Sequence, residues 1–521
     1  SAALERPLVC SVAAEAALLQ AAVIAVILAL GLLDFELRRR RFIRRVRTME
    51  QHNPFAFIAP RLSFLRHSFQ SRLPGVTVVM PCKGVHAQSY QNWKSQVASL
   101  YGGALEFIFV VESEKDPAYA KARELQSEMR MTDIKVVVAG LSFHCSQKIH
   151  NQVVGIDHAS RKSTYLIILD DDIRLHPGTI LAWVAEMEAD PSVFVASGYS
   201  FDWVPRECMT LPTQLVMMWR MMAMAAFANT RPSNLWGGAM MFRREELHRN
   251  VHSIIDAWRD GGYSEDLITI ALCRKHRRHI AMPLAAIFPN RQAQPIPFPR
   301  YWNYMCRQVY VLLTYAFPYH KFVALEMQAV LVVQNLAAVL ATAVSLAVWG
   351  RLLLGAAVAA AGPGEGQTPG EAAWAAAEAF GPTCGRTALF SLVHVASCLA
   401  QAWAFKRCIR CLADLCNTLS PPGAARDPAL RAEPPVEVSH VSAWGLALVQ
   451  VLHNVLVLAG YLRVRLDRSI VWSGVNFTTT DGRIMRIDRR DDQGGWYSVP
   501  RDVTLEESLR ASTRQAAARL Q

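Results

Sequence analysis

Residues 164–172 read TYLIILDDD, a short apolar run that ends in three consecutive aspartates. Short continuous apolar runs are typical of strands that are buried on both faces of a parallel sheet. Three similar runs precede this one, and polar, helix-like segments separate all four. The earlier runs are VTVVM (76–80), EFIFVVES (106–113) and IKVVVAG (134–140). This alternation predicts an α/β domain with a mostly parallel sheet.

Polar residues follow three of the predicted strands. They lie in the segments 81–84, 112–117 and 170–172. Ligands of such sheets bind beyond the carboxyl ends of the strands. We therefore expect these three segments to converge on one edge of the sheet.

The aspartates at 170–172 indicate a cation site. Asp170 and Asp172 point to the same face of a strand, where they repel each other. A divalent cation between them would relieve this, and Mg²⁺ and Mn²⁺ prefer such oxygen ligands and also bind a diphosphate. The alternative is a solvated turn or a helix N-cap before Pro177. The position at the end of a buried strand favours the metal.

Two further segments have alternative interpretations. Glu265 and Asp266 lie in GGYSEDLITIALC (261–273), where Ser264 can cap the apolar helix that follows. The acidic pair is either an ordinary helix start or holds a general base at the mouth of a cavity. NLWGGAMM (234–241) is either a loop close to a sugar or lipid, or a tight turn into a strand.

The composition places part of the chain in a membrane. Of the 521 residues, 52% are hydrophobic and 19% are charged, which excludes disordered, collagen-like and small disulfide-stapled proteins. Residues 9–33 are long enough to cross a bilayer, and the arginine-rich run 38–47 follows them. Because the basic run comes after the apolar one, we expect an anchor rather than a signal peptide. Its N-terminus would be lumenal and the following domain cytosolic.

Three more apolar runs, 329–350, 387–405 and 443–462, predict a C-terminal membrane bundle. Basic residues follow both of the last two runs, so charge alone leaves the topology of the bundle open. The segments 352–361 and 408–419 are candidates for re-entrant or interfacial elements.

The predicted organisation has five parts. They are an anchor with its basic flank (1–48), a cytosolic domain (49–295), an amphipathic interfacial segment (296–322), a membrane bundle (323–470) and a polar tail (471–521). The bundle contains two Pro/Gly-rich linkers, at 363–370 and 421–435. The aromatic residues of the interfacial segment suit the level of the lipid headgroups. Its Arg307 could additionally reach a phosphate.

Charge and cysteine content exclude other classes of partner. The net charge of +12 does not predict a nucleic-acid partner, because the basic residues gather beside the apolar runs. The 11 cysteines are scattered, and the CxxC at Cys408 and Cys411 has no second pair at zinc spacing. We expect free thiols that face a reducing compartment.

Seven stretches within 75–312 resemble the ceramide glucosyltransferases, specifically their plant and algal branch, among the family 2 inverting glycosyltransferases. The stretches are VVMPCKGV, NWKSQVASLYGGALEFIFVVESEKDPAY, KVVVAGLSFHCSQKIHNQ, LDDDIRLHPGTI, LWGGAMM, RDGGYSEDLITIAL and RYWNYMCRQVYVL. The resemblance implies a GT-A-like nucleotide-diphospho-sugar transferase domain. The predicted anchor and membrane bundle also fit the layout of that family.

The resemblance assigns roles to three aspartates. The family's nucleotide-associated aspartate falls on Asp116, which joins Lys83 and Glu112 as a candidate for binding the donor. The aspartate at the metal and the diphosphate falls on Asp170, with Asp172 completing a DxD-like pair. The catalytic base falls on Asp266.

The family's terminal motif is incomplete in this chain. It consists of Gln or Arg, two further residues, and then Arg-Trp; the matching positions here are Tyr304 and Arg307–Gln308. Arg307 is kept as a candidate for binding the donor. Tyr304 could replace the leading residue by stacking, and Gln308 stands where the family has tryptophan.

The resemblance implies glucose transfer from UDP-glucose, with Mg²⁺ or Mn²⁺, to the primary hydroxyl of ceramide. The products would be β-glucosylceramide and UDP, formed with inversion. Ceramide stays in lipid while the donor is water-soluble, so we expect a site at the cytosolic face of the ER or Golgi membrane. The alternatives are a processive polysaccharide synthase, which would need an intact terminal motif, and a non-catalytic membrane scaffold, which the retained aspartates oppose.

Overall fold

The computed structural model describes residues 12–49, 73–361, 382–420, 434–490 and 493–500, together with Thr368. The chain divides into two compact units. The first comprises Ser1–Glu36, Gln328–Ile409 and His440–Ala459, and the second comprises Leu37–Met327, Arg410–Ser439 and Gly460–Gln521. The two predicted linkers, 363–370 and 421–435, fall almost entirely outside the described residues.

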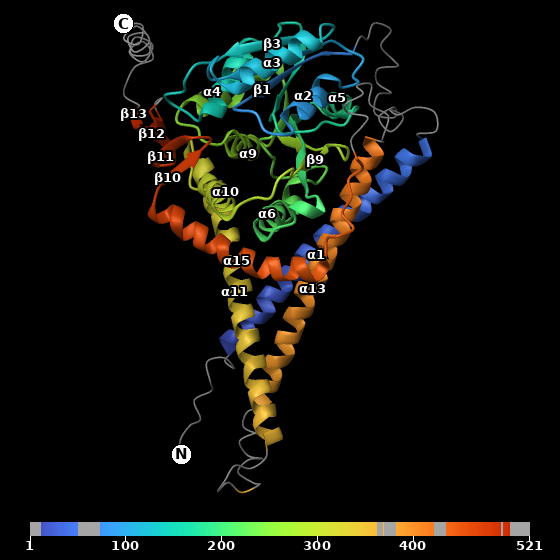
Figure 1. Cartoon of the computed structure of the whole chain (residues 1–521), viewed down its shortest axis with the longest axis vertical. Helices are drawn as coiled ribbons and strands as arrows, with labels where there is room; N and C mark the ends of the chain where they lie inside the picture. The colour runs from blue at the N-terminus through green and yellow to red at the C-terminus, as the bar shows by residue number, and fades with distance from the viewer. Residues whose placement is uncertain are drawn as a thin grey trace. The chain divides into compact units, whose positions relative to one another are not determined.

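A seven-stranded sheet forms the centre of the second unit (Figure 1). Its spatial order is β3 (Asp133–Val138), β2 (Leu105–Val111), β1 (Gly75–Pro81), β4 (Ser163–Leu169), β7 (Ala239–Arg243), β5 (Val193–Ser197) and β8 (His279–Ala281). Four of the six neighbouring pairs are parallel, and only β7 runs antiparallel to its neighbours. The predicted α/β class with a mostly parallel sheet is confirmed, and all four predicted strands form at their expected places.

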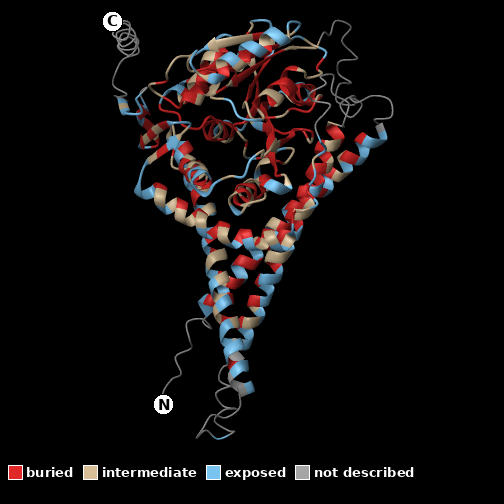
Figure 2. Ribbon diagram, viewed as in Figure 1, coloured by how far each residue is buried: buried red, intermediate tan, exposed pale blue. Residues whose placement is uncertain are grey.

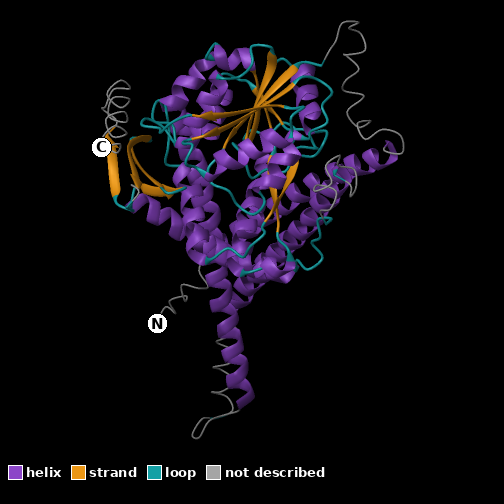
Figure 3. Ribbon diagram, turned by 45° about the horizontal axis from the view of Figure 1, so that its top comes forward, coloured by secondary structure: helices purple, strands orange, loops and turns teal. Residues whose placement is uncertain are grey.

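Helices and short helical turns surround this sheet (Figure 3). They are α2 (Ser89–Val97), α3 (Pro117–Glu128), α4 (Gln147–Asp157), α5 (Thr179–Ala189), η3 (Arg206–Cys208), α6 (Leu211–Phe227), α7 (Arg244–His248), η4 (Val251–Ser253), α8 (Ile254–Arg259), α9 (Glu265–Lys275) and α10 (Phe298–Val311). The polar, helix-like segments between the four predicted strands correspond to α2, α3 and α4.

The central strands are buried on both faces, as their continuous apolar sequences predict (Figure 2). Ile108 and Val110 of β2 share a hydrophobic core with α4. Phe109, between them, faces the other way, and its ring centroid lies 5.3 Å from that of Trp93 on α2. Gly155 lets α4 approach closely, because a Cβ there would lie 2.3 Å from Val79 Cγ1. The sheet therefore needs helices on both sides and offers only its edge to a ligand.

Two smaller sheets complete the second unit. β6 (Tyr199–Trp203) pairs in parallel with β9 (Ile287–Arg291). Near the C-terminus, β10 (Ser469–Trp472), β11 (Val475–Thr480), β12 (Arg483–Arg490) and β13 (Trp496–Pro500) form an antiparallel four-stranded sheet. The sequence predicted only a polar tail over 471–521. Residues 469–500 instead contain these strands, with Ile470, Phe477 and Ile487 buried.

Four helices among the described residues are long and apolar enough to cross a membrane, and they coincide with the four predicted runs. They are α1 (Val12–Met49), α11 (Pro318–Ala361), α13 (Pro382–Leu419) and α15 (Ala443–Leu466). The segments considered as separate re-entrant elements, 352–361 and 408–419, are continuous with α11 and α13.

Small side chains and ion pairs join the helices of the first unit. Leu18 and Ala21 of α1 pack against Ala337 and Ala341 of α11, and such small residues let helices approach closely in lipid. Glu36, which is fully buried, accepts two hydrogen bonds from Arg407, at 2.8 and 3.0 Å.

The arginine-rich end of α1 belongs to the second unit and is not wholly exposed. Arg39 is 1% exposed, and its Nη2 donates to the carbonyl oxygen of Ala228 at 2.7 Å. Arg47 donates to Thr418 Oγ1 at 3.2 Å. These two arginines are therefore engaged by protein groups.

Candidate functional site

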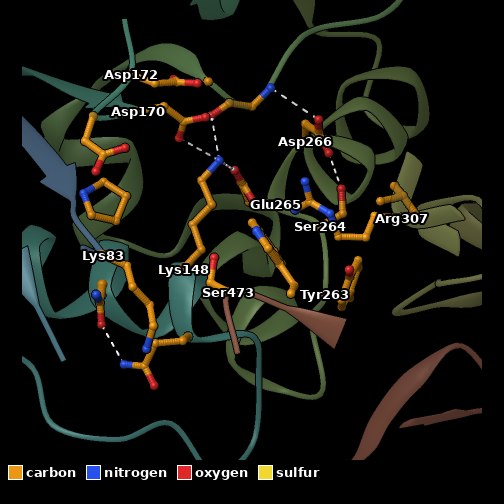
Figure 4. Close-up of a pocket in the computed structure, with 18 of the residues that line it drawn as sticks. Lys83, Lys148, Asp170, Asp172, Tyr263, Ser264, Glu265, Asp266, Arg307 and Ser473 are labelled. Atoms are coloured by element: carbon orange, nitrogen blue, oxygen red, sulfur yellow. Dashed lines mark hydrogen bonds and ion pairs between the residues drawn. The ribbon is translucent and has the colours of Figure 1, made fainter. Parts of the chain in front are cut away.

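The second unit contains a cavity of about 340 Å³ beyond the carboxyl ends of β1 and β4 (Figure 4). Its lining comes from segments that are far apart in the sequence: Pro81–Lys83; Gln147, Lys148 and Asn151; Asp170–Asp172; Arg220; Trp236–Gly238; Tyr263–Asp266; Tyr304, Arg307, Gln308 and Val311; and Trp472, Ser473, Val475 and Phe477. The structure thus brings five of the predicted site residues to one cavity. They are Lys83, Asp170, Asp172, Asp266 and Arg307.

Lys148, on α4, bridges two of the carboxylates of the cavity (Figure 4). Its Nζ lies 2.7 Å from Asp170 Oδ1 and 2.7 Å from Glu265 Oε1. The side chains of Lys148, Asp170 and Glu265 are 17%, 25% and 4% exposed. Burial alone would lower the pKa of Lys148, but attraction to the two carboxylates raises it above its ordinary value. Lys148 therefore carries its positive charge at neutral pH.

The acidic cluster holds more carboxylates than Lys148 can neutralise. Burial raises the pKa of Asp170 to about 6 against the attraction of Lys148, and repulsion by Asp172 and Glu265 adds to the shift. Burial also raises the pKa of Asp171 well above its usual range. Such raised carboxyl pKa values are typical of sites that gain stability when a further cation binds.

The DxD-like pair could provide part of the coordination shell of a cation, with a bound ligand providing the rest. Among the described residues, no three His, Cys, Asp or Glu side chains are grouped so that they could hold a metal by themselves. Mg²⁺ commonly binds through one or two carboxylates, with water and substrate phosphates filling the other positions. Asp170 and Asp172 could supply those two carboxylates.

Asp266 lies at the start of α9 and lines the cavity. Its Oδ1 accepts hydrogen bonds from the hydroxyl of Ser264 and, at 2.8 Å, from the N–H of Leu267. Its Oδ2 accepts from the N–H of Gly237 at 3.2 Å. Burial raises the pKa of Asp266, and repulsion by Glu265 adds to this, while Ser264 opposes it. The predicted cap residue Ser264 thus donates to the Asp266 side chain and caps no backbone group with its hydroxyl.

The loop at 234–241 lines the cavity and also leads into a strand. Trp236, Gly237 and Gly238 line the cavity, and β7 begins directly after them. A Cβ on Gly237 would lie 2.6 Å from Glu265 Oε1 and 3.2 Å from Asp266 Cβ. Only glycine at this position lets the loop approach the two acids of α9.

Of the donor-binding residues predicted near β1 and β2, Lys83 lines the cavity and the other two do not. Lys83 lines the cavity and forms an ion pair with Glu112. Asp116 is the N-cap of α3: its Oδ1 accepts from the N–H of Ala118 at 2.9 Å and from that of Gly84 at 2.8 Å. Glu112 and Asp116 therefore contact the segment after β1, and neither is among the residues that line the cavity.

Arg220 adds a further cation, from α6. Its Nε lies 3.0 Å from Asp202 Oδ2, and its guanidinium lies 5.9 Å from the ring centroid of Trp236. Burial raises the pKa of Asp202, and attraction to Arg220 opposes that shift. Asp202 also accepts hydrogen bonds from Asn290 and Gln292, at 3.3 and 3.2 Å. This network fixes Arg220 at the cavity wall.

Arg307, on α10, lies near two aromatic rings. Its guanidinium carbon is 5.8 Å from the ring centroid of Tyr304 and 5.4 Å from that of Trp472. The Nε atom of Arg307 is buried and has no hydrogen-bond partner among the described residues. The prediction that Tyr304 stacks is consistent with this geometry.

Sequence reasoning missed Lys148, Arg220 and the C-terminal residues of the cavity. Lys148 and Arg220 each lie inside a helical segment, where a single basic residue normally faces solvent. Trp472 and its neighbours lie more than 150 positions after the other lining residues. The only available signal was alternation of apolar and polar residues in the tail, as in GRIMRIDRR (482–490).

Part of this domain is similar in sequence to known proteins. Residues 53–250 match the sequence profile of glycosyl transferase family 21. A stretch of 117 residues is 30% identical to Ceramide glucosyltransferase 1 of Caenorhabditis elegans. It covers 22% of this chain and 24% of the worm protein, so the chain spans about a quarter of the length of that curated relative.

Two solved structures show partial similarity. One is the mannosyltransferase PcManGT from Pyrobaculum calidifontis in complex with GDP-Man and Mn²⁺, with a TM-score of 0.36, 17% identity, and coverage of 73% of this chain and 99% of that chain. The other is GalNAc-T7 with UDP, GalNAc and Mn²⁺, with a TM-score of 0.32, 11% identity, and coverage of 48% and 52%. The predicted resemblance to ceramide glucosyltransferases agrees with these matches: residues 53–250 are similar to glycosyl transferase family 21, and a partial stretch is similar to a ceramide glucosyltransferase.

Proposed function

We propose that this protein transfers glucose from UDP-glucose to the primary hydroxyl of ceramide, with inversion at the anomeric carbon. The observation that carries the proposal is that Asp266 and the DxD-like pair, Asp170 and Asp172, line the same cavity. The match to family 21 and the similarity to Ceramide glucosyltransferase 1 support the choice of substrates.

The cavity has groups that suit a nucleotide diphosphate. Lys148 and Arg307 would bind phosphate oxygens through charge-assisted hydrogen bonds. Asp170 and Asp172 would hold Mg²⁺ or Mn²⁺, which when bound neutralises charge on the departing UDP. Lys83 would contact the nucleotide directly, while Glu112 would hold Lys83 in position.

Asp116 would act on the donor indirectly. Its carboxylate ties the N–H of Gly84 to the first turn of α3 and so fixes the segment after β1. That segment includes Lys83, which lines the cavity. Asp116 would therefore shape the nucleotide-binding surface.

Asp266 would take the proton of the attacking hydroxyl. Its Oδ1 already accepts two hydrogen bonds, whereas its Oδ2 accepts only the bond from Gly237 among the described residues. A carboxylate oxygen has two lone pairs, so Oδ2 keeps one for the hydroxyl of the acceptor. The acceptor oxygen then bonds to the anomeric carbon as the bond to UDP breaks. The proton stays on Asp266 until solvent removes it.

The acceptor explains the apolar helices. Ceramide has two long chains and does not leave lipid, so the transferase must reach it from the membrane. The four candidate spanning helices would hold the protein there. We propose that the protein is integral to the ER or Golgi membrane, with the cavity on the cytosolic side, where a water-soluble donor has access.

The direct test uses the full chain purified in detergent, with labelled UDP-glucose and Mn²⁺. We expect a labelled glycolipid when ceramide is added, with the β configuration at its anomeric carbon by NMR, and UDP in equal amount. Diacylglycerol serves as the control acceptor. Label in a polymer, label in the control lipid, or no lipid product would each contradict the proposal.

Replacing Ser264 with alanine should move the acidic limb of the pH–rate profile upward by about one pH unit. The Ser264 hydroxyl donates to Asp266 and lowers its pKa, so its removal raises that pKa further. A base works only when deprotonated, so activity is lost as pH falls through the pKa of Asp266, and this loss would begin at a higher pH. The measurement is kcat between pH 5 and pH 9, values chosen to span roughly the range where a raised carboxyl pKa would titrate.

The matched control for this prediction is Ser264→Thr, which keeps the hydroxyl. It should retain the acidic limb of the wild type. Coincident limbs in Ser264→Ala and the wild type would show that Asp266 does not control the pH dependence.

A further inference from the structure

The C-terminal sheet forms one wall of the cavity. Trp472 ends β10, Val475 begins β11, and Ser473 and Gly474 make the turn between them. Both turn residues have positive φ, +49° and +79°, as a two-residue hairpin of the I′ type requires. Trp472, Ser473, Val475 and Phe477 line the cavity together with the DxD-like pair. Figure 4 shows Ser473 within the group of labelled cavity residues.

Several contacts fix this hairpin to the rest of the second unit. The hydroxyl of Tyr310, on α10, donates to the carbonyl oxygen of Arg468 at 2.8 Å and lies 2.9 Å from Thr479 Oγ1. The ring of Tyr263 lies 5.7 Å from those of Trp472 and Phe477. The turn is therefore attached both to α10, which carries Arg307, and to the segment that leads into Asp266.

Contacts of β12 attach the sheet to further segments around the cavity. Arg489, on β12, is 5% exposed. Its Nη2 donates to Gln147 Oε1 at 2.6 Å and to the carbonyl oxygen of Ser142 at 3.2 Å. Its Nη1 lies 3.4 Å from Glu112 Oε2. The sheet thus spans from the segment after β2 to α10, which makes it a fixed wall of the cavity.

The position of Trp472 affects Arg307 directly. The guanidinium carbon lies 5.4 Å from the ring centroid of Trp472 and 5.8 Å from that of Tyr304, so both rings restrict its position. Aromatic rings attract the charge but accept none of its strong in-plane hydrogen bonds. The N–H edge of Arg307 is therefore left for an anion, and its buried Nε has no partner among the described residues.

We propose that Trp472 is a positioning residue: it holds the Arg307 guanidinium so that its N–H edge binds the diphosphate of the donor. This inference rests on the proposed function, because it takes the ligand to be a nucleoside diphosphate. The residue directly after Arg307 is Gln308, at the position where the family motif has tryptophan. Trp472, from the C-terminal sheet, supplies an aromatic ring beside Arg307 instead.

The test compares binding of UDP and of uridine, which lacks phosphates, to the full chain in detergent by calorimetry with Mn²⁺ present. Trp472→Ala should weaken UDP binding about tenfold. Removing the ring removes its cation–π contact with Arg307, so the guanidinium is no longer held in position to bind the diphosphate. Binding of uridine should stay within about twofold. Trp472→Phe keeps a ring beside Arg307 and should weaken UDP binding by less than about threefold.

A double-mutant cycle separates positioning from general support. If Trp472 acts through Arg307, then Trp472→Ala should add nothing to Arg307→Ala, and the double variant should bind UDP as the Arg307 variant does. The matched control is Trp496→Ala. Trp496 belongs to the same sheet and lies 4.9 Å from the guanidinium carbon of Arg490, but it is 49% exposed and outside the cavity lining. It should leave UDP binding unchanged.

Three outcomes would overturn this inference and leave the proposed function standing. In the first, the losses of UDP binding caused by Trp472→Ala and Arg307→Ala multiply in the double variant. In the second, Trp472→Ala weakens binding of uridine and of UDP equally, and in the third, Trp496→Ala weakens UDP binding as much as Trp472→Ala does. Trp472→Phe that behaves like the alanine variant would also contradict it. Absence of UDP binding by the wild-type chain would instead overturn the proposed function, and the inference with it.

Discussion

Replacing Asp266 with asparagine should lower kcat by about 10²–10⁴-fold, the usual contribution of a general base, while UDP-glucose still binds. Asparagine keeps an oxygen that can accept the hydrogen bonds from Ser264 and Leu267, so the start of α9 should keep its structure. What asparagine lacks is the basicity to take a proton from the acceptor hydroxyl. The measurement pairs turnover of ceramide with calorimetric binding of UDP-glucose.

The matched control is Asp260→Asn. Asp260 lies six residues earlier, is 49% exposed and forms an ion pair with Arg483 outside the cavity lining. Exposed pairs contribute little to stability, so this variant should turn over at nearly the rate of the wild type. Full turnover by Asp266→Asn with intact donor binding would exclude Asp266 as the base.

The neighbouring acid, Glu265, is a poorer candidate for that role. Its Oε1 lies 2.7 Å from Lys148 Nζ and accepts from Gln152 Nε2 at 3.3 Å. The side chain is 4% exposed, so an acceptor hydroxyl has little access to it. We therefore propose different roles for the two adjacent acids: Glu265 would balance charge, and Asp266 would face the acceptor.

The central domain could be predicted because its signals are local. Four apolar runs alternate with polar helical segments, and this pattern requires a sheet that is covered on both faces. The runs also locate the carboxyl ends of the strands. Once those ends are known, Lys83 and Asp170 must lie at the same edge, since parallel neighbouring strands end together. Both residues do line the cavity.

The remaining parts of the site depend on long-range packing, which local patterns do not encode. Lys148 lies in a helix, α4, whose sequence has no feature that distinguishes it from an ordinary surface helix. The contact between Lys148 and Asp170 forms only when the domain folds. The hairpin that contains Trp472 follows the last apolar helix in the chain. Its short strands carry many charged residues, so the composition indicated a polar tail.

The candidate residues that follow β2 show a different limit. Asp116 and Glu112 follow β2, as the sequence required, but their side chains contact Gly84 and Lys83 instead of facing the cavity. A motif fixes the position of a residue along a strand or loop. It does not fix which way the side chain points, which is set by the groups that donate hydrogen bonds to it.

Replacing Lys148 with methionine should destabilise the domain by about 3 kcal/mol, the lower end of the range for breaking a buried ion pair. Methionine has a similar length but no charge, so Asp170 and Glu265 would be left close together without their common counter-ion. The lower end applies because Lys148 and Asp170 keep some contact with solvent. For a domain of this size, the loss corresponds to a fall in melting temperature of about 6–12 °C.

Added Mn²⁺ should offset part of this loss, which makes the prediction specific to charge. In the wild type, Lys148 already neutralises Asp170, whereas in Lys148→Met a cation at Asp170 and Asp172 would relieve the repulsion by itself. Mn²⁺ should therefore raise the melting temperature more in the variant than in the wild type. Lys135→Met is the matched control, because its partner Glu106 keeps hydrogen bonds from Thr77 and Ser160. That variant should melt close to the wild type, with no larger response to Mn²⁺. Equal melting temperatures and equal Mn²⁺ shifts for Lys148→Met and the wild type would contradict the role of Lys148 as the counter-ion of Asp170 and Glu265.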